Sequence, residues 1–503
     1  MGGNLRTFSK SKLLALRQCP KRFWLEVHHP ELRDDSNATE TSFQIGHQVG
    51  EVARQIYDPE NLGVTIDVET EGFKRAFDRS LQLLKGRQPV FEAGFSINGA
   101  LAFADVMLPV QQDGKDMWRM VEVKSSTSVK DYYRDDIAIQ AYLAQSADVA
   151  LHRISIAHID SSWVYPGNEN YRGLLTECDL TEEAFGRAGE VKEWIVQAQS
   201  ICANPAEPTR ETGAHCSLPF DCGFYNYCTR NDPKAEQPVN WLPRFSSAKV
   251  QDLAKQGTIE MKDVPDEILN VKQRRVKAHT LADTVYFDQA GAAADLSVYS
   301  LPAYFLDFES INPAIPFWLG TRPYQQNCFQ FSLHILESDG QLLHKEFLDL
   351  SGSDPSTAFT QTLIAYCGNS GPVYVYNAAF ETTLIRELSQ RYPDSSDALL
   401  AINARIVDLL PIARERYYHP SQEGSWSIKK VLPAVVPELS YADLDGVQDG
   451  GKAQEAFMEA IHPNTSTDRK SQLEGQLLEY CKLDTYAMVR LWQVFANRTD
   501  LKL

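Results

Sequence analysis

Residues 304–309 read Tyr-Phe-Leu-Asp-Phe-Glu, and this stretch decides the fold of the C-terminal part of the chain. Its apolar residues predict a buried strand. Side chains alternate between the two faces of a strand, so Asp307 and Glu309 point to the same face. A buried pair of like charges is costly unless a cation neutralises it, and a divalent metal ion does so directly. We therefore expect this strand to present two metal ligands.

Two further elements follow in order along the chain. Residues 375–381 read Val-Tyr-Asn-Ala-Ala-Phe-Glu and predict a strand that leads into a helix beginning near Glu381. Residues 480–484 read Tyr-Cys-Lys-Leu-Asp inside a helical pattern over 472–495. At a spacing of four, Tyr480 and Asp484 share one helix face. The three elements together indicate one site far more specifically than any one of them alone.

The last part of the chain, roughly 200 residues, resembles the DnaQ-like exonucleases of the DEDD group. Their motifs are Asp-x-Glu, Asn-x-x-(Phe/Tyr)-Asp and Tyr-x-x-x-Asp. The resemblance implies an RNase H-like fold and a 3′–5′ exonuclease that hydrolyses phosphodiesters with two Mg²⁺ or Mn²⁺ ions. It implies that Tyr480 orients the attacking water and that the metal ligands are Asp307, Glu309, Glu381 and Asp484. The sequence departs from the family once, because Glu381 stands where the family usually has Asp.

The N-terminal part carries a second group of charged residues on predicted strands. Strand-like runs cover 90–95, 101–109, 118–124 and 154–164, and helical patterns cover 13–27 and 136–144. Asp105 lies near the end of one strand, and Glu122 and Lys124 lie two apart on the next. Such a hairpin can present two carboxylates and a lysine to a metal-bound phosphate, where the lysine positions water or offsets charge. A chance surface hairpin is the alternative.

This arrangement resembles the PD-(D/E)XK nucleases of the RecB type, including the CRISPR-associated adaptation nucleases. The resemblance implies a second nuclease site built from Asp105, Glu122, Lys124 and Gln140, with His47 as a further metal ligand. The family usually has a tyrosine four residues after the glutamine. Here Tyr142 follows Gln140 by only two residues.

Four of the nine cysteines are placed as a ligand set. Cys216, Cys222 and Cys228 lie within thirteen residues, and Cys19 lies near the start of the chain. In a reducing compartment, clustered thiols favour metal ligation over disulfides. RecB-type relatives carry an iron–sulfur cluster with one cysteine before the nuclease core and three after it, and the resemblance implies a 4Fe–4S cluster here. Zinc is the alternative metal, and ordinary buried thiols are the alternative to any metal.

The length of 503 residues predicts two or three domains. We expect an α/β multidomain protein with a PD-(D/E)XK domain over 1–235, a helical connector over 236–295 and an RNase H-like domain over 296–503. No apolar run approaches the ~20 residues that span a bilayer, and the N-terminus lacks a secretory signal, so we expect a cytoplasmic protein without a membrane partner. The net charge of −18 does not exclude nucleic acid, because binding depends on where basic residues cluster.

The sequence therefore predicts a fusion of a RecB-like and a DnaQ-like nuclease that acts on DNA, with RNA as the alternative substrate. In a second hypothesis the N-terminal domain is held together by the metal cluster and binds nucleic acid without cleaving it. In a third, the whole chain is a non-catalytic scaffold. The sequence does not identify protein partners.

Overall fold

The protein is an α/β chain that divides into two compact units. The computed structural model describes residues 6–35, 37–244, 252–253 and 257–501. Unit 1 consists of Met1–Asp232 with Pro313–Tyr324, and unit 2 consists of Pro233–Asn312 with Gln325–Leu503. The segment expected as a connector over 236–295 is thus part of unit 2, and a loop from the expected C-terminal domain is part of unit 1.

Unit 1 is built on a mixed seven-stranded sheet. The strand order is β2-β3-β4-β5-β6-β7, and β1 pairs with β4. The strands are β1 (Phe8–Ser9), β2 (Val64–Thr65), β3 (Val90–Ile97), β4 (Ala100–Gln112), β5 (Lys115–Lys124), β6 (Leu151–Ile159) and β7 (Leu175–Asp179). The hairpin β4–β5 turns at Asp113 and Gly114, which have φ of 50° and 74°. A tight hairpin requires this left-handed backbone, and Asp-Gly adopts it readily.

The helices of unit 1 are α1 (Lys10–Gln18), α2 (Pro20–His28), α3 (Asn37–Tyr57), α4 (Val68–Glu71), α5 (Phe73–Leu83), α6 (Asp131–Ser146), α7 (Thr181–Gly186), α8 (Ala188–Ala203) and α9 (Tyr225–Cys228). The single helix expected over 13–27 is two helices separated at Cys19. That residue is extended, with φ −160° and ψ 120°, because proline disfavours the helical conformation of the residue before it. The break leaves the Cys19 side chain at a helix junction.

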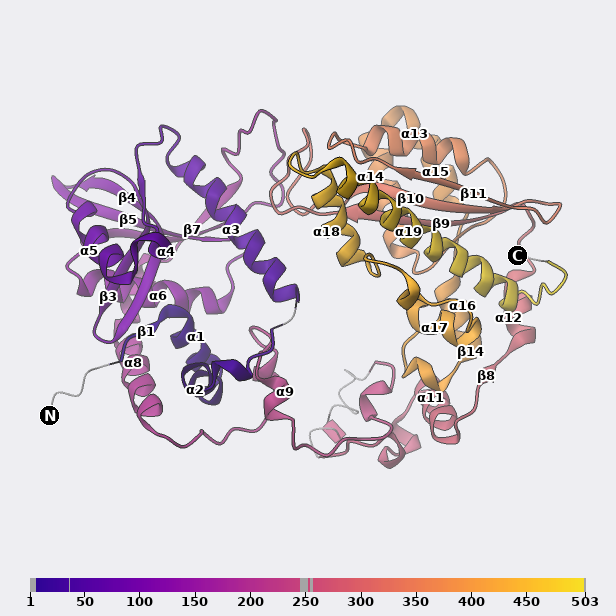
Figure 1. The fold of residues 1–503 in the computed structure, drawn as a ribbon, viewed down its shortest axis with the longest axis horizontal. Helices are drawn as coiled ribbons and strands as arrows, with labels where there is room; N and C mark the ends of the chain where they lie inside the picture. The colour runs from indigo at the N-terminus through magenta and orange to yellow at the C-terminus, as the bar shows by residue number, and fades with distance from the viewer. Residues whose placement is uncertain (1–5, 36, 245–251, 254–256, 502–503) are drawn as a thin grey trace. The chain divides into compact units, whose positions relative to one another are not determined.

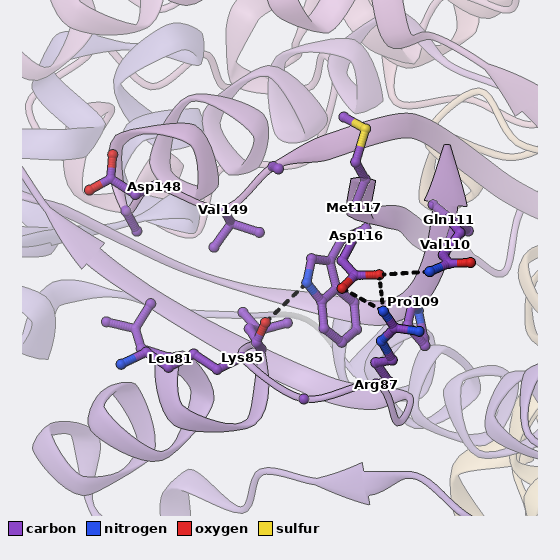
Figure 2. Close-up of a pocket in the computed structure, with 15 residues that line it drawn as sticks. Leu81, Lys85, Arg87, Pro109, Val110, Gln111, Asp116, Met117, Asp148 and Val149 are labelled. Atoms are coloured by element: carbon purple, nitrogen blue, oxygen red, sulfur yellow. Dashed lines mark hydrogen bonds and ion pairs between the residues drawn. The ribbon is translucent and has the colours of Figure 1, made fainter. Parts of the chain in front are cut away.

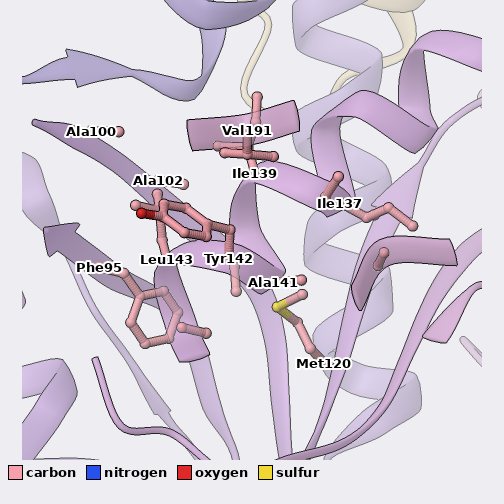
Figure 3. Close-up of a cluster of buried hydrophobic side chains, with 14 of the residues drawn as sticks. Phe95, Ala100, Ala102, Met120, Ile137, Ile139, Ala141, Tyr142, Leu143 and Val191 are labelled. Carbon is pink, nitrogen blue, oxygen red and sulfur yellow. The ribbon is translucent and has the colours of Figure 1, made fainter. Parts of the chain in front are cut away.

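Helix α6 is the crossover between the parallel strands β5 and β6. Its buried face, which includes Ile137 and Ala141, belongs to the apolar core with Phe95 and Met120 from the sheet (Figure 3). Burial of this face fixes the rotation of the helix about its own axis. The direction in which its polar residues point is fixed as a consequence.

The segment Pro313–Tyr324 leaves the C-terminal sheet and completes unit 1. The amide of Tyr165 donates a hydrogen bond of 2.9 Å to the carbonyl of Thr321. The Tyr324 hydroxyl donates to the carbonyl of Ser125, and its ring packs in the same apolar cluster as α3 and β6. Unit 1 is therefore assembled from two stretches of sequence that are far apart.

Unit 2 contains a five-stranded sheet of order β11-β10-β9-β12-β13. Its strands are β9 (Ala303–Ile311), β10 (Asn327–Leu336), β11 (Leu342–Leu348), β12 (Val373–Val375) and β13 (Ile406–Asp408). Strands β9, β10 and β11 are antiparallel neighbours, whereas β12 runs parallel to both β9 and β13. A separate two-stranded sheet pairs β8 (Tyr286–Phe287) with β14 (Tyr417–Tyr418).

Helices cover both faces of the five-stranded sheet. The described helices of unit 2 are α11 (Val271–Ala282), α12 (Gln289–Leu296), α13 (Ser356–Tyr366), α14 (Ala379–Arg391), α15 (Ser396–Ala404), α16 (Leu409–Arg416), α17 (Ile428–Val435), α18 (Gly450–Ile461) and α19 (Thr467–Phe495). Leu306 and Phe308 pack in a core with residues of α13, α14 and α15. Phe305 lies 5.9 Å from the ring of Trp492 in α19, which crosses the other face (Figure 1). The alternation expected along residues 304–309 therefore places the carboxylates toward α19.

Candidate metal centre

Three carboxylates from two elements of unit 2 converge on one point. Strand β9 supplies Asp307 and Glu309, and helix α19 supplies Asp484. One ligand oxygen from each lies within 4.8 Å of the others. In the described part of the chain, no other set of three or more His, Cys, Asp or Glu residues gathers its ligand atoms this closely. The three groups have the chemistry and spacing of a divalent-cation site.

The electrostatics of this carboxylate triad are strongly unfavourable without a cation. Burial, followed by repulsion from Asp484, raises the pKa of Glu309 to about 8. The same two causes, burial and then Asp484, raise the pKa of Asp307 well above its usual range. Burial also raises the pKa of Asp484 to about 6, although a hydrogen bond from Tyr441 opposes the rise. A divalent ion would remove the repulsion and allow all three to ionise.

Glu381 lies in the first turn of α14 and is 3% exposed. Its charge acts on Asp307, but it is not one of the three groups whose oxygens lie within 4.8 Å. Burial raises the pKa of Glu381 to about 8, and its Oε2 has no hydrogen-bond partner among the described residues. Buried polar atoms without partners are rare in folded proteins. The orphaned oxygen fits a metal ligand at the edge of the triad.

Asp408, at the end of β13, holds the segment that leads to Glu381. Its Oδ1 accepts a hydrogen bond of 2.9 Å from the amide of Asn377, and its Oδ2 accepts one of 3.1 Å from the amide of Ala378. Asn377 has φ of 74°, an uncommon backbone state that needs such support. Asp408 therefore shapes the strand-to-helix turn and does not join the triad.

Helix α19 is docked to the sheet by polar contacts as well as apolar ones. The side chain of Gln330 donates a hydrogen bond of 2.8 Å to the carbonyl of Leu477. The hydroxyls of Ser332 and Thr485 lie 2.7 Å apart, and Ser332 is the cross-strand partner of Asp307 in the sheet. These buried contacts fix where α19 lies on the sheet, and they thereby fix the position of Asp484.

Two tyrosines and a lysine surround the triad. Tyr480 is 4% exposed and lies one turn from Asp484 on α19, as the spacing predicted. Tyr441 donates a hydrogen bond of 2.5 Å to Asp484. The ammonium of Lys429 in α17 lies 5.4 Å from the centre of each of the two tyrosine rings. Tyr441 and Lys429 were not foreseen. The apolar spacing of Ile428, Val431 and Leu432 favours a helix at Lys429, but it does not show that either residue reaches the site, because tertiary contacts bring them there.

In unit 1 four predicted residues, Asp105, Glu122, Lys124 and Gln140, lie in a second cluster together with two others, and we call it the lysine–carboxylate cluster. It consists of Lys10, Asp105, Glu122, Lys124, Asp136 and Gln140. The carboxylate of Asp105 accepts a hydrogen bond of 2.7 Å from the amide of Val123. The Lys124 ammonium lies 2.6 Å from Glu122, and the Gln140 amide donates to Glu122 at 2.5 Å. The structure thus brings the hairpin residues and the helix residue together.

Lys10 and Asp136 belong to this cluster although the motifs did not point to them. Lys10 lies 2.9 Å from Glu122 and 2.8 Å from Asp136, and Lys124 lies 2.5 Å from Asp136. Burial alone would lower the pKa of both lysines, but Asp136 and Glu122 raise it, so both ammonium groups stay charged. Asp136 could have been found from its spacing of four to Gln140 on α6. Lys10 lies more than a hundred residues away in sequence.

Two residues that were considered with this site, His47 and Tyr142, are not part of the lysine–carboxylate cluster. His47 has a side chain that is 80% exposed, and its Nε2 lies 3.9 Å from Glu51. Its role as a metal ligand therefore stays a prediction without a converging partner. Tyr142 points into the apolar core (Figure 3), where its hydroxyl accepts a hydrogen bond of 3.1 Å from Asn98. A spacing of two from Gln140 turns the tyrosine away from the carboxylates.

The four cysteines line one small cavity. All are free thiols, and the amide of Cys222 donates a hydrogen bond of 2.8 Å to the carbonyl of Cys216. Burial is the main cause that raises the pKa of Cys222 and Cys228, and the neighbouring thiols add to it. No three of the four sulfurs lie within 4.8 Å of one another.

A further pocket of unit 1 lies at the turn end of the β4–β5 hairpin, and Figure 2 shows its lining. The Arg87 guanidinium lies 2.6 Å from the Asp116 carboxylate across it, and the Trp118 indole donates to the carbonyl of Leu84 at 3.2 Å. Asp116 precedes Glu122 by six residues on the same strand, which places the two roughly 20 Å apart. This pocket is therefore separate from the lysine–carboxylate cluster.

Residues 304–427 match a protein family described as a domain of unknown function (DUF2779). The matched stretch contains Asp307, Glu309 and Glu381 and ends before Lys429, Tyr480 and Asp484. No curated protein matches the chain. In the described part of the chain, no helix has the length and apolar character needed to cross a membrane.

Proposed function

We propose that the protein is a metal-dependent nuclease whose unit 2 is an RNase H-like, DnaQ-like 3′–5′ exonuclease. The observation that carries this proposal is the convergence of Asp307, Glu309 and Asp484 within 4.8 Å. The orphaned oxygen of Glu381 supplies a fourth ligand. Buried carboxylates at this density destabilise the fold unless cations bind them, so they indicate a functional site.

Each residue has a role in this proposal. Asp307, Glu309, Glu381 and Asp484 would hold Mg²⁺ or Mn²⁺. Two such ions would supply an activated water and stabilise the leaving oxygen of a phosphodiester. The Tyr480 hydroxyl, one helical turn from Asp484, orients the attacking water. Tyr441 holds the carboxylate of Asp484 in place by its hydrogen bond. The side chain of Glu381 is one methylene longer than the usual Asp and would extend its carboxylate from α14 toward the ions.

A time course on 5′-labelled single-stranded DNA with Mn²⁺ tests this proposal. Wild type should give a ladder that shortens from the 3′ end, and Asp307→Asn should lose this ladder, whether or not unit 1 still cleaves the DNA. Asp397→Asn, which changes an exposed aspartate in the first turn of α15, is the matched control and should cleave like wild type. The same assay on single-stranded RNA decides between DNA and RNA. A wild-type protein that cleaves neither would favour the scaffold hypothesis.

For unit 1 we propose a PD-(D/E)XK nuclease site in the lysine–carboxylate cluster. The contacts of Lys124 with Glu122 and of Gln140 with Glu122 support it. Asp105 and Glu122 would ligate the metal, and Lys124 would stabilise charge on the phosphate. If both sites cleave, Glu122→Gln and Asp307→Asn should each remove part of the activity. If Asp307→Asn removes all of it, unit 1 is a binding module without catalysis.

We propose a 4Fe–4S cluster on Cys19, Cys216, Cys222 and Cys228, with zinc as the alternative. The common cavity, which all four cysteines line, supports a shared metal group. Anaerobically purified wild type should be brown and contain iron, and Cys216→Ser should lose the colour. Cys178→Ser, a cysteine on β7 outside this cavity, is the control. A colourless protein with one zinc per chain would identify the other metal.

A further inference from the structure

Lys429 is held beside the metal centre in an unusual way. Its ammonium donates one hydrogen bond, of 2.7 Å, to the carbonyl of Gln448. It lies over the faces of Tyr441 and Tyr480, at 5.4 Å from each ring centre. Aromatic faces attract cations, so the two rings and the carbonyl stabilise the ammonium at this position. The side chain is half-buried, which keeps it close to the site without removing it from solvent.

The charge of Lys429 acts on the triad without pairing with it. It lowers the pKa of Asp307, Glu309 and Asp484, against larger contributions from burial. Yet in the described part of the chain no carboxylate oxygen lies within the 4.0 Å of an ion pair with its ammonium. Lys10 and Lys124 differ, because each pairs directly with Glu122. Lys429 therefore leaves the triad available to cations.

The remaining donors of Lys429 have no acceptor among the described residues. An ammonium has three N–H donors, and the carbonyl of Gln448 accepts from one of them. Once cations neutralise the triad, the attraction between Lys429 and the carboxylates is offset. Lys429 is then a fixed positive charge with free N–H donors at the edge of a metal centre. The ligand that suits this position is an anion that also approaches the metals.

We propose that Lys429 contacts a non-bridging phosphate oxygen of the nucleic-acid strand bound at the metal centre. The assignment rests on the proposed exonuclease function of unit 2. The lysine positions the phosphate and offsets the charge that develops on it, as a side-chain donor does in other acyl- and phosphoryl-transfer sites. Tyr441 connects phosphate binding with metal binding, because its ring contacts the Lys429 ammonium and its hydroxyl donates a hydrogen bond to Asp484.

The experiment compares K429M with wild type in the full chain, with E122Q present in both so that only unit 2 cleaves. The probes are Mn²⁺ alone and a 5′-labelled single-stranded oligodeoxythymidylate. K429M should bind Mn²⁺ as tightly as wild type or a few-fold more tightly, because a nearby positive charge is gone. Its kcat/KM should fall by about 30- to 100-fold, and the dependence of log KM on log salt concentration should become shallower by about 0.7.

K430M is the matched control. Lys430 is the next residue of α17 and pairs with Glu423 at 2.6 Å, with both side chains 44% exposed. K430M should retain wild-type cleavage, and K429R should recover much of what K429M loses, because it keeps the charge. Thermal midpoints of all three variants verify that they are folded.

Three outcomes would overturn the assignment. Unchanged cleavage by K429M would show that the lysine does not contact substrate. An equal loss of Mn²⁺ binding and cleavage in K429M, not recovered by K429R, would make Lys429 a structural support of the metal site. A wild-type chain that neither binds Mn²⁺ nor cleaves would remove the proposed function itself, and this result differs from the first two because it appears without any change at Lys429.

Discussion

The hydroxyl of Tyr441 donates a hydrogen bond of 2.5 Å to Oδ1 of Asp484, although 43 residues separate them along the chain. Both side chains are buried, at 7% exposure each. The bond satisfies one oxygen of a buried carboxylate that lies close to Asp307 and Glu309, and it restricts the orientation of that carboxylate. Groups that orient a metal ligand in this way commonly change metal affinity by 10- to 100-fold when removed.

Replacing Tyr441 with Phe should therefore weaken Mn²⁺ binding by about 10-fold, because Asp484 loses its hydrogen bond while the ring beside Lys429 remains. Isothermal titration of the protein with Mn²⁺ measures the effect. Tyr417→Phe is the control, since the Tyr417 hydroxyl is bonded to the carbonyl of Ala434 at 2.9 Å and lies outside the site. Equal Mn²⁺ affinity in Tyr441→Phe and wild type would contradict this role.

The stability of the metal-free protein should fall as the pH rises from about 5 to 8. Glu309 and Glu381 have pKa values of about 8 and Asp484 about 6, against 4.5 and 3.8 for the ordinary side chains. The folded protein thus binds more protons than the unfolded chain in this range. The stabilisation is complete below the ordinary values and is lost as the pH rises through the folded ones.

Thermal midpoints across this pH range, with EDTA and with Mn²⁺, measure the effect. The decline should be present in EDTA and largely absent in Mn²⁺, because the ion favours ionised carboxylates. Asp307→Asn should flatten the EDTA curve, since it removes one of the repelling charges. A midpoint that rises from pH 5 to 8 in EDTA would contradict the prediction.

Lys10→Met should destabilise unit 1 by about 3 kcal/mol, because it removes one of the two ammonium groups that balance the negative charge of the buried carboxylates. The Glu122 carboxylate that it contacts is 3% exposed. Adding Asp136→Asn should recover part of the loss, and a double-mutant cycle in urea measures the coupling. Lys12→Met, on the same helix and outside the cluster, is the control. Additive effects of the two changes would show that the ion pair does not couple them.

Tyr324→Ala should destabilise unit 1 by about 2 kcal/mol, although Tyr324 follows β9, the strand of Asp307 and Glu309 in unit 2. The change removes a ring from the cluster with α3 and β6 and a hydrogen bond to the Ser125 carbonyl. Amide exchange in β6 should accelerate. Tyr299→Ala, at a tyrosine of unit 2 that is 41% exposed, should leave exchange in β6 unchanged. Identical exchange in both variants would argue against a structural role of the loop.

The sequence indicated those parts of the site that depend on local geometry. The period of two along a strand placed Asp307 and Glu309 on one face, and the spacing of four on a helix placed Tyr480 beside Asp484. It also indicated the strand end at Asp408, which closes β13. It did not indicate β11, an edge strand with Lys345 and Glu346 at its centre, because this strand lacks an alternating apolar pattern.

What the sequence by itself determined is an α/β chain with strands and helices whose carboxylates lie on predictable faces, because these follow from backbone periods within a few residues. Only the tertiary structure decided which distant residues complete each site. Lys429 and Tyr441 reach the triad, Lys10 reaches Glu122, and Pro313–Tyr324 enters unit 1. Such contacts form where burial and the pairing of opposite charges across the fold favour them. The spacing of residues along the chain does not indicate them.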